Sequence, residues 1–318
     1  MFSYCYNVCM SDVSVDVSVI IVNYNTKDLL FNCLSSLFLQ THDVAMEVFV
    51  SDNGSTDGSL DMVRKDFPSV IVIDNQKNLG FGAANNKALA VAKGKYILYL
   101  NSDTVVLNNA VKLFFDYWEH APDKDDIGAL GCNLLNAERQ IIHSYGILQE
   151  DVWVDIRHNA KDLLRSVKNS IPFLNRTHLG KVPNDIKPKY VGEVGFVTGA
   201  DLFVRNDEYA RFDERYFLYS EDADLQKSMA LAGKKRLIVE GPEIQHLKGK
   251  SDKSRSVMDF YCSTSKIHTQ LSSCIYHRKF NSQKKGSIFL LKAVIFIMWL
   301  NPLLFGRTRH YIPKLLKI

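Results

Sequence analysis

The segment Val17-Ser-Val-Ile-Ile-Val22 is rich in β-branched residues and almost entirely apolar, as a strand must be when both faces of its sheet are covered. Further apolar, strand-like segments follow at 47–51, 70–74 and 96–100. Segments with helical periodicity or composition lie between them, at 28–39, 59–67 and 81–92. Strands that alternate with helices at this spacing predict an α/β fold with a mostly parallel, doubly wound sheet and helices on both faces.

A short polar loop comes after each of the four predicted strands. The loops are Asn23-Tyr24-Asn25, Asp52-Asn53-Gly54-Ser55, Asn75-Gln76-Lys77-Asn78 and Asn101-Ser102-Asp103. Doubly wound sheets bind their ligands in the crevice beyond the carboxyl ends of the strands. We therefore expect the four loops to form one site for a polar ligand.

The composition is typical of a soluble globular protein. Of the 318 residues, 46% are hydrophobic and 23% are charged, and 17 Gly, 8 Pro and 6 Cys exclude collagenous, disordered and disulfide-scaffold proteins. The cysteines form no C-x-x-C pair, which argues against a zinc cluster and favours reduced thiols in the cytoplasm. The sequence contains no P-loop motif, no G-x-G-x-x-G after the first strand and no pattern of a secretory signal.

The second half of the chain is less regular. Residues 151–190 have weak periodicity and scattered charge, so we predict a variable insertion or lid there. A strand-like segment at 196–205 is followed by a predicted helix from Glu221 to Ala232, whose first turn contains three acids, Glu221, Asp222 and Asp224. The helix dipole alone favours acids at this position. The aromatic segment 216–219 just before them indicates an apolar wall, which would raise the basicity of a carboxylate as a general base requires.

Seven motifs occur in a defined order along the chain. They are VSVIIVNYN (17–25), VSDNGSTDGS (50–59), NLGFGAANN (78–86), GKYILYLNSDT (94–104), VTGADLFVR (197–205), FLYSEDADLQ (217–226) and IQHLKGKS (244–251). Together they resemble the family 2 glycosyltransferases, and most of all the rhamnosyltransferase-type enzymes that build bacterial surface polysaccharides.

The resemblance implies a GT-A glycosyltransferase domain over residues 17–250, after an irregular segment at 1–16 and before a tail at 251–318. It also implies an inverting transfer of a sugar from a nucleoside diphosphate donor, dTDP-rhamnose or a UDP-sugar, to a hydroxyl of a glycan or polyprenyl-linked acceptor. The alternative is a catalytically degenerate protein of the same fold that binds sugar nucleotides or acts as a scaffold.

The resemblance also assigns a metal site. Mg²⁺ and Mn²⁺ take oxygen ligands, and Mn²⁺ also accepts imidazole. The D-x-D-like motif of the family reads Asn101-Ser102-Asp103 here, so Asp103 is the expected metal ligand and Ser102 lies beside it. His246 matches the position of a second ligand.

The remaining residue roles follow from the same matches. Asp222 is the expected general base, with Glu221 as its neighbour on the acceptor side. Asp201 either binds a sugar hydroxyl of the acceptor or is a solvated strand end. The nucleotide contacts are expected from Asp52 to the N3–H of uracil or thymine and from Tyr24 and Asn25 to the ring, with Lys77, Asn78, Ser102 and Asp103 nearby. Lys77 substitutes for an arginine that the family often has near Gly80.

The C-terminal tail is strongly basic. Fourteen Lys and Arg from Lys248 onward stand against two Asp, a net charge of +12 within a chain of +4, which leaves about −8 for the first 247 residues. The apolar stretch 288–305 is interrupted by Lys292 and Asn301-Pro302, so an interfacial helix on an anionic membrane surface fits better than a spanning helix. A buried C-terminal helix is the alternative. We expect a cytoplasmic protein, peripheral on the inner face of the membrane, and no nucleic-acid partner, because no reader motif occurs.

Overall fold

The computed structural model describes residues 14–170, 186–247 and 260–318. Its centre is an eight-stranded sheet in the order β3-β2-β1-β4-β10-β6-β11-β8. The strands of the first half are β1 (Val17–Asn23), β2 (Met46–Asp52), β3 (Ile71–Asp74) and β4 (Tyr96–Asn101). Those of the second half are β6 (Ile127–Gly131), β8 (Gly192–Glu193), β10 (Asp201–Arg205) and β11 (Lys235–Ile238). Two small sheets pair β5 (Thr104–Val106) with β12 (Ile244–His246) and β7 (Tyr145–Gly146) with β9 (Phe196–Val197).

Helices cover both faces of the central sheet, which confirms the predicted α/β class. Along β1, Val19 and Ile21 point into one core cluster and Ile20 into the other, and all three are fully buried. The first cluster is closed by α1 (Lys27–Gln40), α2 (Ser59–Asp66) and α4 (Ala110–His120). The second is closed by α3 (Phe81–Leu89), the short helix η2 (Glu208–Ala210) and α6 (Glu221–Leu231). Because the neighbours of β1 run parallel to it, the polar loops after β1 to β4 end at one edge of the sheet.

The second half of the sheet differs from the regular alternation of the first. The predicted strand at 196–205 is two strands, β9 and β10, separated by the turn at 198–200. β10 runs antiparallel to both β4 and β6, so it inserts into the otherwise parallel centre. α4, β6 and β11 were not predicted from the sequence.

The C-terminal part forms a helical bundle. It contains α5 (Val152–Ser170), α8 (Thr264–Phe280), α9 (Lys285–Trp299), α10 (Pro302–Thr308), η3 (Arg309–Tyr311) and α11 (Ile312–Lys317). These helices share a core of their own, in which Val152 of α5 packs with Leu291 and Trp299 of α9. The segment predicted as an irregular insertion or lid therefore contains a 19-residue helix that belongs to the bundle. The predicted domain boundary near residue 250 lies outside the described residues.

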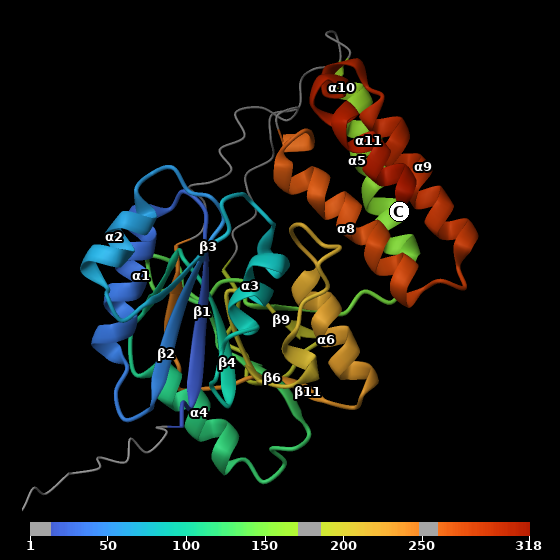
Figure 1. Ribbon diagram of the computed structural model, residues 1–318. Helices are drawn as coiled ribbons and strands as arrows, with labels where there is room; N and C mark the ends of the chain where they lie inside the picture. The colour runs from blue at the N-terminus through green and yellow to red at the C-terminus, as the bar shows by residue number, and fades with distance from the viewer. Residues whose placement is uncertain (1–13, 171–185, 248–259) are drawn as a thin grey trace, which may run out of the picture.

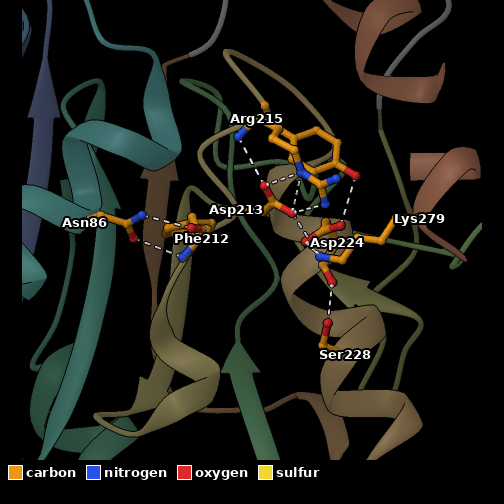
Figure 2. A network of polar contacts seen from close by, with 8 residues as sticks. Asn86, Phe212, Asp213, Arg215, Asp224, Ser228 and Lys279 are labelled. Atoms are coloured by element: carbon orange, nitrogen blue, oxygen red, sulfur yellow. Dashed lines mark hydrogen bonds and ion pairs between the residues drawn. The ribbon is translucent and has the colours of Figure 1, made fainter. Parts of the chain in front are cut away.

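Helix α8 attaches the bundle to the sheet domain. The ammonium group of Lys279 pairs with Asp224 at 2.7 Å and with Asp213 at 3.1 Å, and the ring of His268 stacks on Phe217 at 4.5 Å between centroids. Figure 2 shows Lys279 reaching across from α8 to Asp224 on α6. In Figure 1 the bundle lies on the α6 side of the sheet, on the opposite side from α1 and α2.

Candidate functional site

The loops after β1, β2 and β4 are joined by side-chain hydrogen bonds. The amide of Asn23 donates to Asp52 Oδ2 at 2.7 Å and to Ser55 Oγ at 3.0 Å, while the Ser55 N–H donates to Asp52 Oδ1 at 2.7 Å. The hydroxyls of Thr26 and Ser102 lie 3.0 Å apart, which connects the first loop to the D-x-D-like motif. These loops therefore lie in contact, and their role as one site for a polar ligand stays a prediction. Asn23 and Ser55 were not singled out from the sequence, although their positions at strand ends were the available signal.

Asp52 is more buried than expected for a residue that contacts a nucleobase. Its side chain is fully buried, and each of its carboxylate oxygens already accepts a hydrogen bond. A carboxylate oxygen can accept a second donor, so contact with a nucleobase stays a prediction that requires the loop to open toward the base.

The other predicted nucleotide contacts lie on the surface around this loop cluster. Tyr24 is half exposed, and Asn25, Lys77 and Asn78 are exposed. Asn25 has a left-handed backbone and accepts a hydrogen bond from the Thr56 N–H at 2.8 Å, which fixes its orientation. Tyr24 belongs to neither core cluster of the sheet domain, and stacking of its ring on a base stays a prediction.

Glycine at position 80 has a steric explanation. Its φ is +88°, and a Cβ there would lie 2.3 Å from the carbonyl oxygen of Phe217. The Phe81 N–H also donates to that oxygen at 2.9 Å. The loop before α3 is thus packed directly on the segment before α6, and no arginine side chain fits at Gly80 in this arrangement.

The two predicted metal ligands lie side by side. His246 is opposite Thr104 in the β5–β12 pair, so its ring reaches back to the preceding residue, and His246 Nε2 lies 3.1 Å from Asp103 Oδ1. Asn101 Nδ2 is 3.4 Å from the same ring nitrogen. In the ranges that the structure describes, His246 Nδ1 is buried without a hydrogen-bond partner, and no group of three or more His, Cys, Asp or Glu side chains that could hold a metal ion occurs.

This pair fits a divalent cation of the kind expected. Mg²⁺ in particular is held by one or two carboxylates together with substrate phosphates and water, so a cage made wholly of protein is not needed. The imidazole favours Mn²⁺ as the alternative. Asp103 and His246 would hold the ion, with the remaining positions left for a phosphate-bearing ligand.

The predicted base lies at the N-terminus of α6. Asp222 Oδ2 accepts the Gly199 N–H at 3.1 Å, and Oδ1 accepts the Ala223 N–H at 2.8 Å. Tyr219 and Ser220, directly before the helix, both have positive φ, at 69° and 66°. Non-glycine residues in that region cost about 1–3 kcal/mol each, and such strain gathers at functional sites.

Burial raises the pKa of both acids at the start of α6. The pKa of Glu221 is raised by burial and then by the neighbouring Asp222 charge, and its Oε2 has no hydrogen-bond partner among the described residues. Burial also raises the pKa of Asp222, but the N–H groups of Ala223 and Gly199 oppose this effect. The pKa of both acids is therefore raised, and Asp222 differs from Glu221 in that two backbone N–H groups contact its carboxylate.

Two other acids have structural contacts. Asp224 accepts the Tyr216 hydroxyl at 2.9 Å and pairs with Lys279, so it fastens α6 to α8 (Figure 2). Asp201 is fully buried rather than solvated, and its Oδ2 accepts the Cys132 N–H at 2.7 Å, which ties β10 to the end of β6. Burial raises the pKa of Asp201 to about 7. Asp201 does not line the cavity described next, so its position gives no support to a contact with an acceptor.

A cavity of about 530 Å³ lies in front of Asp222, within the range of small-molecule sites. The sheet domain contributes Asn101, Thr198, Asp222 and His246 to its lining. The bundle contributes a second wall, formed by Asp155 of α5 and by Thr269, Ser273 and Tyr276 of α8. No local pattern indicated this wall, because only the contacts of α8 with α6 and with the segment before it bring residues so distant in the chain to one cavity.

The outer surface of the bundle is partly apolar and partly basic. On α9, Ile288, Leu291 and Ile295 are buried, whereas Phe289 is 74% and Ile297 53% exposed. The alternative of a buried helix thus describes one face of α9, whereas the other face is exposed and its contact with a membrane stays a prediction. Within the described ranges, no single helix is long and apolar enough to cross a bilayer, whereas α9 and the segment Pro302–Lys317, bent by 107°, meet that criterion only together.

Residues 18–137 match the model of glycosyl transferase family 2. Over 119 residues the chain is 34% identical to a poly(ribitol-phosphate) beta-glucosyltransferase of Bacillus spizizenii, an alignment that covers 36% of this chain and 19% of that protein. An N-acetylglucosaminyl-diphospho-decaprenol L-rhamnosyltransferase of Mycobacterium tuberculosis is 26% identical over 256 residues, or 76% of this chain and 78% of that protein. The chain thus spans only about a fifth of the length of the first relative.

Solved structures agree with the predicted GT-A fold. A mannosyltransferase from Pyrobaculum calidifontis, solved in complex with GDP-Man and Mn²⁺, superposes with a TM-score of 0.53 at 16% identity. The alignment covers 95% of this chain and 78% of that one. Residues 18–137 therefore form a glycosyl transferase family 2 domain within a GT-A fold, as the order of the seven motifs predicted.

Proposed function

We propose that this chain, which carries a glycosyl transferase family 2 domain, is an inverting glycosyltransferase of cell-surface polysaccharide synthesis. It would move a sugar from a nucleoside diphosphate donor, dTDP-rhamnose or a UDP-sugar, to a hydroxyl of a glycan or lipid-linked acceptor. One observation carries the proposal: Asp222 and His246 line the same cavity, and Asp103 contacts His246 at 3.1 Å. The proposed base and one proposed metal ligand thus line one cavity of about 530 Å³, and the second proposed ligand contacts the first.

An inverting sugar transfer needs two kinds of group from the protein, a general base and ligands for a cation. An inverting transfer needs one carboxylate that removes the proton of the acceptor hydroxyl as its oxygen attacks the anomeric carbon. Asp222 has that role, because two backbone N–H groups orient its carboxylate and burial raises its pKa, which makes it a stronger base. Mn²⁺ or Mg²⁺ bound by Asp103 and His246 would neutralise the charge that develops on the departing nucleoside diphosphate.

The donor nucleotide is assigned to the loops after β1 to β4. Tyr24 offers a ring for stacking with the base, and Asp52 is the acceptor for the N3–H that uracil and thymine share. Asn25, Lys77, Asn78 and Ser102 surround the path from base to diphosphate. Support comes from the hydrogen bonds that join Asn23, Asp52 and Ser55 into one cluster.

We also propose that the protein works in the cytoplasm, at the inner membrane surface, where a polyprenyl-linked acceptor would be met. The exposed side chains of Phe289 and Ile297 on α9 and of Leu303 on α10 support this proposal, together with the basic character of the tail. Apolar burial and about 1 kcal/mol for each Lys or Arg near an anionic leaflet would add up along this face.

The competing function is a scaffold that binds sugar nucleotides without turnover, which the Asn at position 101 would suit. A panel of UDP- and dTDP-sugars, incubated with the full chain and Mn²⁺, separates the two. The enzyme releases nucleoside diphosphate and loses that activity with a chelator. A scaffold shows an increase in melting temperature with a donor but no release, because binding to the folded state alone stabilises it by RT ln(1 + [L]/Kd).

A further inference from the structure

The cavity in front of Asp222 has a wall to which the proposed chemistry assigns no role. Asp155 of α5, Ser273 and Tyr276 of α8, and Gln149 from the segment before α5 all line it. None of them belongs to the motifs shared with the family, and residues 18–137 of the family match end before all four. This wall is therefore a feature of the bundle, which covers the cavity from the α6 side.

Asp155 is held rigidly at this wall. The Asn281 amide lies 3.0 Å from His277 Nδ1, and His277 Nε2 lies 3.0 Å from Asp155 Oδ2. Because the amide group donates to Nδ1, the proton of the imidazole belongs on Nε2, from which it is donated to Asp155. The Ser273 hydroxyl donates to the same oxygen, and His277 is fully buried behind the carboxylate.

The other carboxylate oxygen of Asp155 can accept one more hydrogen bond. Oδ1 accepts a hydrogen bond from the Gln149 amide at 2.9 Å, and a carboxylate oxygen accommodates two donors. The Asp155 side chain is 22% exposed and lines the cavity. Burial raises the pKa of Asp155, but the hydrogen bonds from His277 and Ser273 outweigh it, and the net pKa lies below the usual value. Asp155 is thus a fixed, charged acceptor for a hydroxyl group.

A second polar group at the wall has no protein partner. Tyr276 is 3% exposed and lines the cavity, yet its hydroxyl makes no hydrogen bond in the part of the chain that the structure describes. Buried hydroxyls are nearly always paired, and an unpaired one costs about 1–3 kcal/mol. Because the hydroxyl oxygen is itself buried, a ligand in the cavity would remove that cost only with a small movement of the wall. A carboxylate, an amide and a phenol beside aromatic surface are the groups that recognise a sugar ring with several hydroxyls.

The position of the wall separates it from the donor side. The nucleotide loops and the Asp103–His246 pair lie at the ends of β1 to β4 and on β12. α8 instead contacts the segment just before α6, where Ser272 Oγ donates to the Leu218 carbonyl at 2.9 Å and the Tyr219 hydroxyl bonds Ser265 at 2.9 Å. Asp222, at the start of α6, lines the same cavity as His246 and as the wall. In an inverting displacement the attacking hydroxyl and the leaving group occupy opposite sides of the anomeric carbon, and the base accompanies the hydroxyl.

We propose that the wall formed by Gln149, Asp155, Ser273 and Tyr276 binds the acceptor sugar, and that Asp155 is the residue that selects its hydroxyl pattern. The proposal rests on the proposed glycosyltransferase function and adds the acceptor subsite to it. His277 and Asn281 are positioning residues that act through Asp155. The bundle thus contributes directly to acceptor specificity as well as to the proposed contact with the membrane.

The test compares acceptor kinetics with donor hydrolysis in the full chain. The acceptors are N-acetylglucosaminyl diphosphate on a short alkyl chain and a panel of free monosaccharides, each at saturating donor and Mn²⁺. Asp155→Asn should raise the acceptor KM by about ten- to a hundred-fold, since a hydrogen bond to a charged group is lost. Donor hydrolysis without acceptor is measured on the same preparations, to establish that each variant still binds and uses its donor.

Two further variants keep the test decisive. Asp162→Asn makes the same chemical change on the same helix, at a residue that pairs with Lys266 and does not line this cavity, and it should leave the acceptor KM unchanged. Tyr276→Phe removes only a hydroxyl that has no partner in the described structure, so it should fold normally and raise the acceptor KM by about two- to tenfold. If Asp155→Asn does not fold, Tyr276→Phe decides the outcome.

The possible failures are distinguishable. An unchanged acceptor KM in Asp155→Asn and Tyr276→Phe, in a protein that hydrolyses its donor, would overturn the acceptor subsite and leave the proposed function standing. So would active donor hydrolysis with no member of the acceptor panel bound or glycosylated. A parent protein that neither binds nor hydrolyses any donor would overturn the proposed function and the acceptor subsite together.

Discussion

Replacing Asp222 by Asn tests the assignment of the general base with little change of shape. The Asn side chain keeps one carbonyl oxygen, so it can still accept one of the two N–H groups, of Gly199 and Ala223, that now contact the carboxylate. The other N–H loses its acceptor, which should lower the free energy of unfolding by about 1–3 kcal/mol. An amide cannot take up the acceptor proton, so the transfer rate should fall by about 10²- to 10⁴-fold.

The assay measures transfer, donor binding and thermal unfolding on the same preparation. The donor Kd should stay close to that of the parent protein, because Asp222 contacts neither of the predicted metal ligands. Asp224→Asn is the matched control on the same helix. It weakens the ion pair with Lys279 and should lower stability without the large loss of rate. Near-normal transfer by Asp222→Asn would refute Asp222 as the general base. Glu221, the neighbouring acid in the cavity, would then be the next candidate.

Three further predictions concern the metal, the bundle and its surface. Asp103→Ala and His246→Ala should each weaken Mn²⁺-dependent donor binding, measured by calorimetry; an unchanged Mn²⁺ titration in the His246 variant would return this residue to a structural role. Lys279→Met should lower the free energy of unfolding by about 1–3 kcal/mol in denaturant titration, because it leaves two carboxylates without their shared cation, and an unchanged midpoint would mean that the pairs contribute nothing. Phe289→Ser should weaken co-sedimentation with anionic vesicles and make the remainder more sensitive to salt, whereas Leu39→Ser, an equally exposed change on α1, should not; equal binding by both variants would contradict the membrane face.

The first half of the fold was predictable because local pattern and tertiary environment agree there. The apolar run at 17–22 and the helices after it follow each other at short separations, so their alternation alone indicates the parallel order of β1 to β4. For β10 the local sequence pattern was not sufficient. Its sequence reads as an ordinary strand, and nothing local reveals that it pairs antiparallel between β4 and β6.

The candidate site was also only partly predictable from the sequence. Asp103, Asp222 and His246 were identified through motifs that stand at fixed positions relative to strand ends and a helix start. Asp155 was not, because its significance depends on His277, 122 positions later, and on the packing of α8 against α6. Asp201 was misjudged for a related reason: its motif gave the position along the strand, but only the sheet shows that this strand end is fully buried.

The central claim is an inverting transfer with Asp222 as the base, and the stereochemistry of the first turnover tests it most directly. Time-resolved ¹H NMR of donor hydrolysis, with the first donor that the protein accepts and with Mn²⁺, reports the anomeric configuration of the released sugar before it equilibrates in water. We predict a sugar of configuration opposite to that of the donor, and no such product from Asp222→Asn. Release of a sugar with the configuration retained, or equal release by Asp222→Asn, would contradict it.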